Sequence, residues 1–190
     1  MPPRRRIFSS RRRELPAWLA IALLIAAVLT VSGIPYLIVR EGTREAPPGS
    51  PVVTLQLPPG VSLGSLREGR VENVVDGDTI DVRVDGQSVR VRYFGVDTPE
   101  RGDRCYREAT ERNRTLIGDS VLLLPDARDS DRFGRSLRYV FSTSGVSVDA
   151  TLVAEGYGLA WKEDGRYREE IIALEEDARA EGRGCLWERN

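Results

Sequence analysis

The chain has 190 residues, with 28 Lys and Arg, 29 Asp and Glu and no histidine, and its formal net charge is −1. The absence of histidine excludes Ser-His-Asp and Cys-His catalytic groups, HExxH zinc sites and a histidine general base. The two cysteines, Cys105 and Cys185, are too few and too far apart for a zinc knuckle. Carboxylates and arginines therefore remain as the candidates for proton transfer and phosphate binding.

The charges are unevenly placed along the chain. Residues 1–45 carry eight arginines and three acids, whereas residues 46–190 carry 20 basic and 26 acidic side chains and are six units negative. A broad groove for nucleic acid is usually basic. A polyanion bound by the acidic part of the chain must therefore be held at a focused site.

Near the N-terminus, residues 17–39 form a run of 23 residues without a charge. This run exceeds the roughly 20 residues that a helix needs to span a bilayer, and Trp18 and Tyr36 lie near its two ends, where amphipathic rings prefer the interface. The sequence therefore predicts a transmembrane helix. The alternative is a signal peptide that is cleaved from a secreted protein.

The segments beside this run predict its orientation. Six arginines lie in residues 1–16, and they outnumber Arg40 and Arg44 on the other side. The positive-inside rule then makes residues 1–16 a cytoplasmic tail of a single-pass protein of the cell membrane and places the rest of the chain outside. Residues 40–66, which are rich in Pro and Gly, predict an extended linker to a domain at 67–190.

Within this domain, alternating apolar residues predict strands at 70–76, 79–84 and 88–96, joined by the turns Asp76-Gly77 and Asp85-Gly86. Five strands with helices between and after them favour an α+β, mainly β, fold: a small antiparallel barrel with helices on one side. The remaining predicted elements are two strands, 120–124 and 136–141, and three helices, 105–117, 148–156 and 167–182.

Carboxylates recur where the predicted strands turn or stop. Asp78 follows the first turn and Asp97 ends the third strand, so pairing of the second and third strands brings both to one end of the ladder. Two adjacent carboxylates repel unless a cation joins them, and Ca²⁺ accepts 6–8 oxygen ligands, including carbonyls and water. The pattern predicts a calcium site made by Asp78, Asp97 and the carbonyl of Thr98. Glu100 is placed to reach a water molecule bound there.

Two arginines are candidates for binding the phosphate. Arg92 lies on the third strand and Arg135 ends a polar loop. Guanidinium groups make two-point contacts to phosphate oxygens and keep their charge, so they stabilise negative charge but are poor proton donors. Taken singly, these features have simpler explanations, because an Asp-Gly pair is often only a turn, residues 97–100 could begin a helix, and an arginine on a strand often faces solvent.

In combination, the motifs VVDGDTIDV, RYFGVDTPE, DRFGRSLRYVF, VDATLVAEGYG and GCLW resemble the staphylococcal nuclease (thermonuclease) family over about residues 70–187. The resemblance implies a five-stranded OB-fold barrel with three helices, and Ca²⁺-dependent cleavage of DNA and RNA that leaves 3′-phosphates. The loop after Glu100, RGDRCYR, is shorter than the lysine-rich loop of the best-known member, and the domain is acidic where that member is basic.

Carried over by position, the resemblance implies a role for each matching residue. It makes Asp78 and Asp97 calcium carboxylates and Thr98 a carbonyl ligand. It makes the catalytic residues Arg92, Glu100 and Arg135. It also places Arg132 and Phe133 beside the nucleotide, where Phe133 can stack on a base. By the same resemblance, Asp76 looks like a nearby acid that shapes the metal site without a firm direct role. Trp161 and Tyr167 are candidates for an expected aromatic pair.

The sequence thus predicts a membrane-tethered, extracytoplasmic nuclease that hydrolyses phosphodiester bonds in DNA and/or RNA with Ca²⁺. Its predicted partners are nucleic acid and, through residues 17–39, the lipid bilayer, and no protein partner is predicted. Export would permit a Cys105–Cys185 disulfide, with two free thiols as the alternative. The competing functions are a non-catalytic OB-fold module that binds nucleic acid or protein, and a structural domain that only binds calcium.

Overall fold

The structure is a computed structural model that describes residues 50–188. The predicted tail at 1–16, the predicted transmembrane helix at 17–39 and the first part of the predicted linker lie outside the described residues. Within residues 50–188, none of the helices has both the length and the apolar character needed to cross a bilayer.

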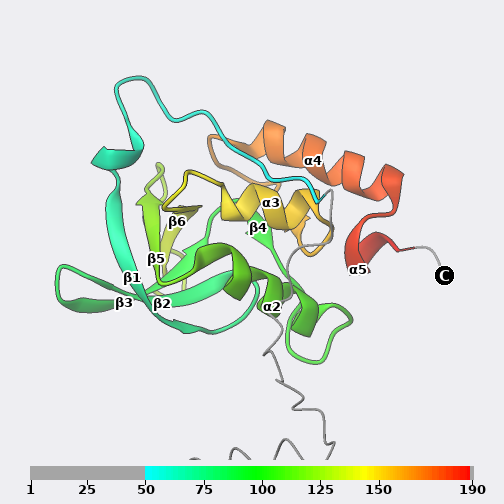
Figure 1. Ribbon diagram of the computed structural model, residues 1–190, viewed down its shortest axis with the longest axis horizontal. Coiled ribbons are helices and arrows are strands. Elements are labelled where there is room, and N and C mark those ends of the chain that lie inside the picture. The colour runs from blue at the N-terminus through cyan, green and yellow to red at the C-terminus, as the bar shows by residue number, and fades with distance from the viewer. Residues whose placement is uncertain (1–49, 189–190) are drawn as a thin grey trace, which may run out of the picture. The chain divides into compact units, whose positions relative to one another are not determined.

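Five strands close into a barrel in the order β1-β2-β3-β6-β5 (Figure 1). The predicted five-stranded barrel is confirmed, but the prediction that all its strands are antiparallel is wrong, since β3 and β6 run parallel. The chain between these two strands includes a helix and β5, which is the kind of long crossover that parallel pairing requires. The strands are β1 (Arg67–Val74), β2 (Thr79–Val84), β3 (Gln87–Tyr93), β5 (Ser120–Leu124) and β6 (Ser136–Ser142).

The predicted strand 88–96 is divided in the structure. β3 ends at Tyr93, and β4 (Val96–Asp97) leaves the barrel to pair with β7 (Leu159–Ala160). Between them, Gly95 packs so closely against α4 that a Cβ atom there would lie 2.5 Å from Cδ1 of Ile171. The chain therefore bends away from the barrel at a residue that has no side chain to obstruct the packing, and it carries Asp97 with it.

The helices gather on one side of the barrel in Figure 1. The three predicted helices are present, and the short α5 and a 3-10 turn at Leu63–Ser65 were not predicted. Inward residues of β2, β3, β5 and β6 and buried residues of three helices form one hydrophobic core, and this burial is the main stabilising contribution. The helices are α2 (Tyr106–Ile117), α3 (Val148–Ala154), α4 (Arg168–Glu181) and α5 (Gly184–Trp187).

Residues 50–66, which belong to the predicted linker, pack against the domain. The cyan segment in Figure 1 runs beside α3 and α4. The backbone N–H of Val53 donates to Oγ1 of Thr151 at 3.1 Å, and the hydroxyl of Tyr167 donates to the carbonyl of Gln56 at 2.8 Å. Alternate apolar side chains of the segment pack on the core, namely Val53, Leu55 and Leu57.

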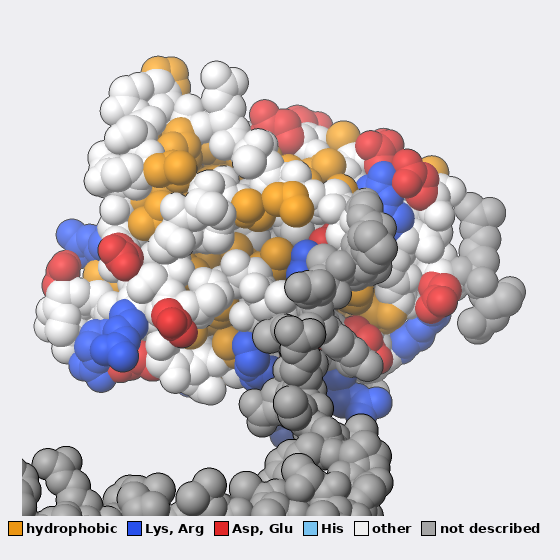
Figure 2. All heavy atoms as spheres, in the orientation of Figure 1, with side chains coloured by type: hydrophobic (Ala, Val, Ile, Leu, Met, Phe, Trp, Pro, Cys, Tyr) orange, Lys and Arg blue, Asp and Glu red, His pale blue; other side chains and the backbone are white. Residues whose placement is uncertain are grey.

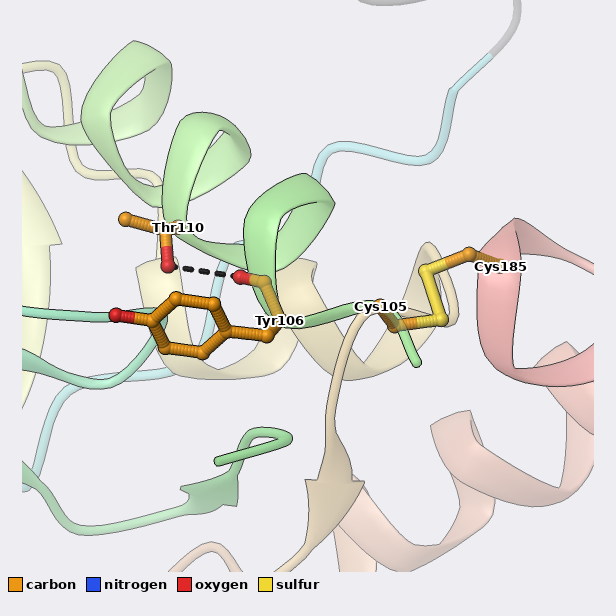
Figure 3. The surroundings of a disulfide bond; sticks show 4 residues. All are labelled: Cys105, Tyr106, Thr110 and Cys185. Carbon is orange, nitrogen blue, oxygen red and sulfur yellow. Dashed lines mark hydrogen bonds between the residues drawn. A yellow bond between two sulfur atoms is a disulfide. The ribbon is translucent and has the colours of Figure 1, made fainter. Parts of the chain in front are cut away.

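A disulfide joins Cys105, just before α2, to Cys185 in α5 (Figure 3). The two Cα atoms are 5.6 Å apart, the bond spans 80 positions of sequence, and Cys105 is buried. The alternative of two free thiols is therefore not what the structure has. The bond ties the loop that follows Glu100 to the last helix of the domain.

Candidate active site

The candidate site is centred on the guanidinium of Arg92, which lies opposite Thr79 in the β2–β3 ladder. Its Nε lies 3.1 Å from Oδ1 of Asp78, and its Nη2 lies 2.6 Å from Oδ1 of Asp97. Its Nη1 donates to the carbonyls of Tyr93 at 2.7 Å and Val96 at 2.5 Å. The guanidinium is therefore fixed, with one edge directed at the two carboxylates that the sequence predicted to meet.

Asp78 also connects two separate turns of the chain. Its Oδ2 accepts the backbone N–H of Thr98 at 2.6 Å and the Thr98 hydroxyl at 2.7 Å, and its Oδ1 accepts the hydroxyl of Thr79 at 3.1 Å. Both Asp78 and Thr98 are buried, whereas the side chain of Asp97 is 54% exposed. Of the predicted metal ligands, Asp97 is thus the one most open to solvent.

Asp76 and Asn113 support the turn that carries Asp78. Oδ1 of Asp76 accepts the N–H of Asp78 at 3.1 Å, and the Asn113 amide donates to the Asp76 carbonyl at 2.9 Å while accepting the Tyr93 hydroxyl at 2.7 Å. Burial, and then the charge of Asp78, raises the pKa of Asp76. The sequence analysis missed Asn113. Its signal is a polar residue on the buried face of α2, between Ala109 and Ile117.

One cavity of about 520 Å³ collects most of the predicted site residues. Asp78 and Thr98 do not line it, because they are buried at the bases of the turns. Other residues of its wall include Phe94, Arg128, Asp131, Trp161 and Glu163. The predicted residues that line the cavity are Arg92, Asp97, Glu100, Arg132, Phe133 and Arg135.

Asp131 shapes the loop that presents Arg135 and Phe133. Its Oδ1 accepts the N–H groups of Phe133 and Arg135, each at 2.9 Å, and its Oδ2 accepts Nε of Arg135 at 2.6 Å. Burial acts to raise the pKa of Asp131, but these bonds hold the pKa below its usual range. The ring of Phe133 is left 69% exposed, with the guanidiniums of Arg132 and Arg135 4.7 and 5.5 Å from its centroid.

A second aromatic wall faces the same cavity. The guanidinium of Arg128 lies 5.1 Å from the ring centroid of Phe94 and 5.6 Å from that of Trp161, and Asp164 accepts bonds from both Arg128 and Trp161. Tyr167, the other candidate for the aromatic pair, is instead buried against Tyr139. That expectation for Tyr167 is wrong, because its ring fills the core beneath α4.

The donor atoms fit a hard cation. Asp78, Asp97 and the Thr98 carbonyl offer only oxygen, which suits Ca²⁺ or Mg²⁺ and not zinc. Within residues 50–188, no three Asp, Glu, His or Cys side chains converge where they could hold a metal, so carbonyl and water oxygens would complete the shell. Arg92 contacts the carboxylates of Asp78 and Asp97, and burial, followed by the charge of Asp78, raises the pKa of the neighbouring Asp76.

A closed five-stranded barrel that carries these carboxylates and arginines at one end has the form of a nuclease of the staphylococcal type. Residues 90–189 match the family described as staphylococcal nuclease homologue. The chain belongs to this family, and membership supports nuclease activity on nucleic acid.

Three similar proteins illustrate the range of identity. Protein ParB of Escherichia coli is 37% identical over 132 residues, covering 63% of this chain and 71% of ParB. An uncharacterized endonuclease of Escherichia coli O157:H7 is 34% identical over 121 residues, covering 63% of this chain and 76% of the relative. Micrococcal nuclease of Shigella flexneri is 31% identical over 128 residues, covering 63% of this chain and 72% of the relative.

Proposed function

We propose that the chain is a Ca²⁺-dependent, sugar-nonspecific nuclease that hydrolyses phosphodiester bonds of DNA and/or RNA. One observation carries the proposal: Arg92 of β3, Asp97 of β4, Glu100 of the loop after β4 and Arg135 of the loop before β6 line a single cavity. The relatives named endonuclease and micrococcal nuclease support the same class of reaction. Phe133 and Trp161, on the walls of the cavity, offer faces on which bases can stack.

In the proposed reaction, a water oxygen forms a bond to phosphorus while one existing P–O bond breaks. Glu100 takes the proton of the attacking water, since it is an exposed carboxylate at the cavity wall. Arg135 contacts the phosphate oxygens as their negative charge grows, with its guanidinium oriented by Asp131. The arginines hold their protons too firmly to act as acids, so the leaving oxygen takes its proton from solvent.

Arg92 was predicted from the sequence as a group that binds the phosphate. In the structure its Nε–Nη2 edge lies directly on Asp78 and Asp97. A calcium ion bound by Asp78, Asp97 and the Thr98 carbonyl would supply positive charge next to the phosphate and leave that edge of Arg92 available to phosphate oxygens. Its Nη1 contacts keep the guanidinium at the cavity wall in either arrangement.

We propose further that residues 17–39 anchor the nuclease in the cell membrane, with the domain on the outer side. The length of this uncharged run and the six arginines before it support the proposal. Fractionation of cells that express the full chain, followed by protease treatment of intact cells, tests it. Recovery of the whole chain in the soluble cell contents would exclude an anchor.

The nuclease proposal is tested with the purified full-length chain on single-stranded DNA and RNA, with Ca²⁺ or with a chelator. We expect cleavage only with Ca²⁺, and a loss of about 10²–10⁴-fold in Glu100→Gln or Arg135→Ala. Glu163→Gln is the matched control, because Glu163 is an exposed glutamate of the same cavity and has no part in the proposed reaction. Binding without cleavage under every condition would instead indicate a non-catalytic module.

A further inference from the structure

Two glutamates of residues 50–188 are buried, and neither has a part in the proposed reaction. Figure 2 shows acidic side chains on the surface of the face that it draws, several of them beside basic ones. Glu155 and Glu175 are instead only 4% and 2% exposed. A buried carboxylate is costly unless it is paired and hydrogen-bonded. The partners of Glu175 therefore indicate what this residue does in the fold.

The carboxylate of Glu175 connects α4 to β7. Its Oε2 accepts the backbone N–H of Ala160 at 2.8 Å. Its Oε1 is paired with Nη2 of Arg179 at 2.7 Å and with Nζ of Lys162 at 3.1 Å. Because Ala160 is buried, loss of this acceptor would leave its N–H without a partner. The bond between Glu175 and Ala160 therefore fixes β7 against α4.

β7 in turn pairs with β4, which carries Asp97. Ala160 lies opposite Val96 and Leu159 lies opposite Asp97 in an antiparallel register. Each of the two strands has only two residues, and these strands form a sheet separate from the barrel. An isolated pair of strands is marginally stable at best, so its position depends on groups that bind it from outside.

The chain at β7 also packs closely on the predicted calcium ligands. A Cβ atom on Gly158 would lie 3.2 Å from Cγ2 of Thr98 and 3.4 Å from the carbonyl oxygen of Asp97. At the other end of β7, the N–H of Trp161 donates to the carbonyl of Gly95 at 3.0 Å. A displacement of β7 would therefore be transmitted to both ends of the segment that contains Asp97.

We propose that Glu175 is a positioning residue of the active site. Through its bond to Ala160 and the pairing of β7 with β4, it holds Asp97 and the Thr98 carbonyl where they can bind one Ca²⁺ ion together. Arg92 holds β4 from the barrel side, and Glu175 holds it from the side of α4. The proposal rests on the calcium-dependent nuclease function and adds a residue that supports its metal site without touching metal or substrate.

The first test measures the binding of Ca²⁺ alone to purified full-length chains, by calorimetry without substrate, at a temperature at which each chain is folded. We expect about tenfold weaker binding in Glu175→Ala, which loses the acceptor of the Ala160 N–H. Glu175→Gln should bind nearly as the unmodified chain does, because its amide oxygen can accept the same N–H. Glu155→Ala is the matched control, since the carboxylate of Glu155 pairs with Arg112 of α2 instead.

The second test follows hydrogen exchange of the metal-free chains, and so does not depend on calcium. Glu175→Ala should exchange about tenfold faster than the unmodified chain at residues 95–98 and 158–161, since both strands lose their support. Glu155→Ala should leave exchange in these two segments unchanged even though its melting temperature falls. A role of Glu175 in overall stability alone would not distinguish the two variants in this way.

A second variant disturbs the same strand pair while retaining Glu175. In Gly158→Ala, the new methyl group would lie 2.4 Å from Cγ2 of Val96, so β7 must move away from β4. We expect weaker Ca²⁺ binding in Gly158→Ala than in its control Gly64→Ala, where a Cβ atom has no neighbour within 4 Å. This comparison tests the connection between β7 and the calcium ligands if Glu175→Ala does not fold.

The outcomes separate this inference from the nuclease proposal. If the unmodified chain binds Ca²⁺, equal affinity in Glu175→Ala overturns the inference. An equally large loss in Glu175→Gln also overturns it, because the effect would then come from the negative charge and not from the bond to Ala160. Unchanged exchange at residues 95–98 in Glu175→Ala overturns it whether or not Ca²⁺ binds. If the unmodified chain binds no Ca²⁺ but exchange responds as expected, the calcium proposal fails and the positioning of β4 by Glu175 stands.

Discussion

Thr98 donates both its backbone N–H and its hydroxyl to one oxygen of Asp78, at 2.6 and 2.7 Å, across 20 positions of sequence. This pair of bonds joins the turn after β1 to the turn that contains β4, and so sets the position of Asp97 relative to Asp78. The approach is close enough that the residue before Asp78 must lack a side chain. A Cβ atom on Gly77 would lie 2.6 Å from the Thr98 hydroxyl oxygen.

Gly77→Ala is therefore expected to displace Thr98 from Asp78 and to lower nuclease activity about 10²-fold, since a shift of about 1 Å in a catalytic site has effects of that size. The control is Gly64→Ala, where a Cβ atom has no neighbour within 4 Å. Cleavage rates on single-stranded DNA, with the melting temperature of each variant, provide the measurement. Activity in Gly77→Ala equal to that of the control would show that the Asp78–Thr98 contact does not position the site.

The fold could be predicted mainly where local pattern and packing agree. Alternation in 79–84 and the Asp85-Gly86 turn identified β2 and its hairpin with β3, because each strand has one face in the core. The pairing of β3 with β6 could not be read from the pattern, since it depends on how the chain between them crosses the barrel. The two-residue strands β4 and β7 are too short to show any periodicity.

The candidate site divides in the same way. For residues that approach the substrate, the residue type itself indicates the chemistry. Glu100 and Arg135 could therefore be proposed from residue type and order. The roles of residues that support them from behind, such as Asn113 and Asp131, depend on hydrogen-bond partners that the sequence does not specify. The contact of Arg92 with both carboxylates was likewise not predictable, because it depends on where the bend at Gly95 places Asp97 relative to the Arg92 side chain.

Opening the disulfide is expected to destabilise the domain more than it changes the chemistry. The Cys105–Cys185 bond spans 80 positions, which corresponds to roughly 4 kcal/mol in the chain-entropy account. Urea unfolding of the full-length chain with and without a thiol reductant measures this difference. Cys105→Ala/Cys185→Ala is the control, since the reductant should leave its unfolding midpoint unchanged. An equal midpoint for the unmodified chain with and without reductant would contradict the prediction.

Phe133 is expected to contribute to binding through its face. Phe133→Ala should raise KM on single-stranded DNA about tenfold, because stacking of one base on an aromatic ring contributes about 1–3 kcal/mol, while Phe133→Tyr should retain the unmodified value. Val52→Ala is the control, since Val52 is another strongly exposed apolar residue and lies outside the cavity. An equal KM in Phe133→Ala and Val52→Ala would assign the exposed ring no part in binding.

Asp149 is a buried carboxylate that lies behind the site. Its Oδ1 accepts the N–H of Gly95 at 2.9 Å and its Oδ2 that of Val140 at 2.8 Å, so it connects α3 to the bend before Asp97 and to β6. Burial raises the pKa of Asp149 to about 6 from an ordinary 3.8, although the two N–H bonds act in the opposite direction. The folded domain thus binds a proton at Asp149 more readily than the unfolded chain does.

Because the folded-state pKa lies above the unfolded one, Asp149 contributes stability that is present below about pH 4 and is lost as the pH rises through about 6. Asp149→Asn removes this titration, so the free energy of unfolding of the variant minus that of the unmodified chain should increase by about 2 kcal/mol between pH 4 and pH 7. The variant also places an amide NH₂ against a backbone N–H, which lowers its free energy of unfolding by the same amount at pH 4 and at pH 7. This constant cost does not change the expected increase. Urea unfolding of both full-length chains across this range measures it, and a difference that stays constant with pH would show that Asp149 titrates alike in both states.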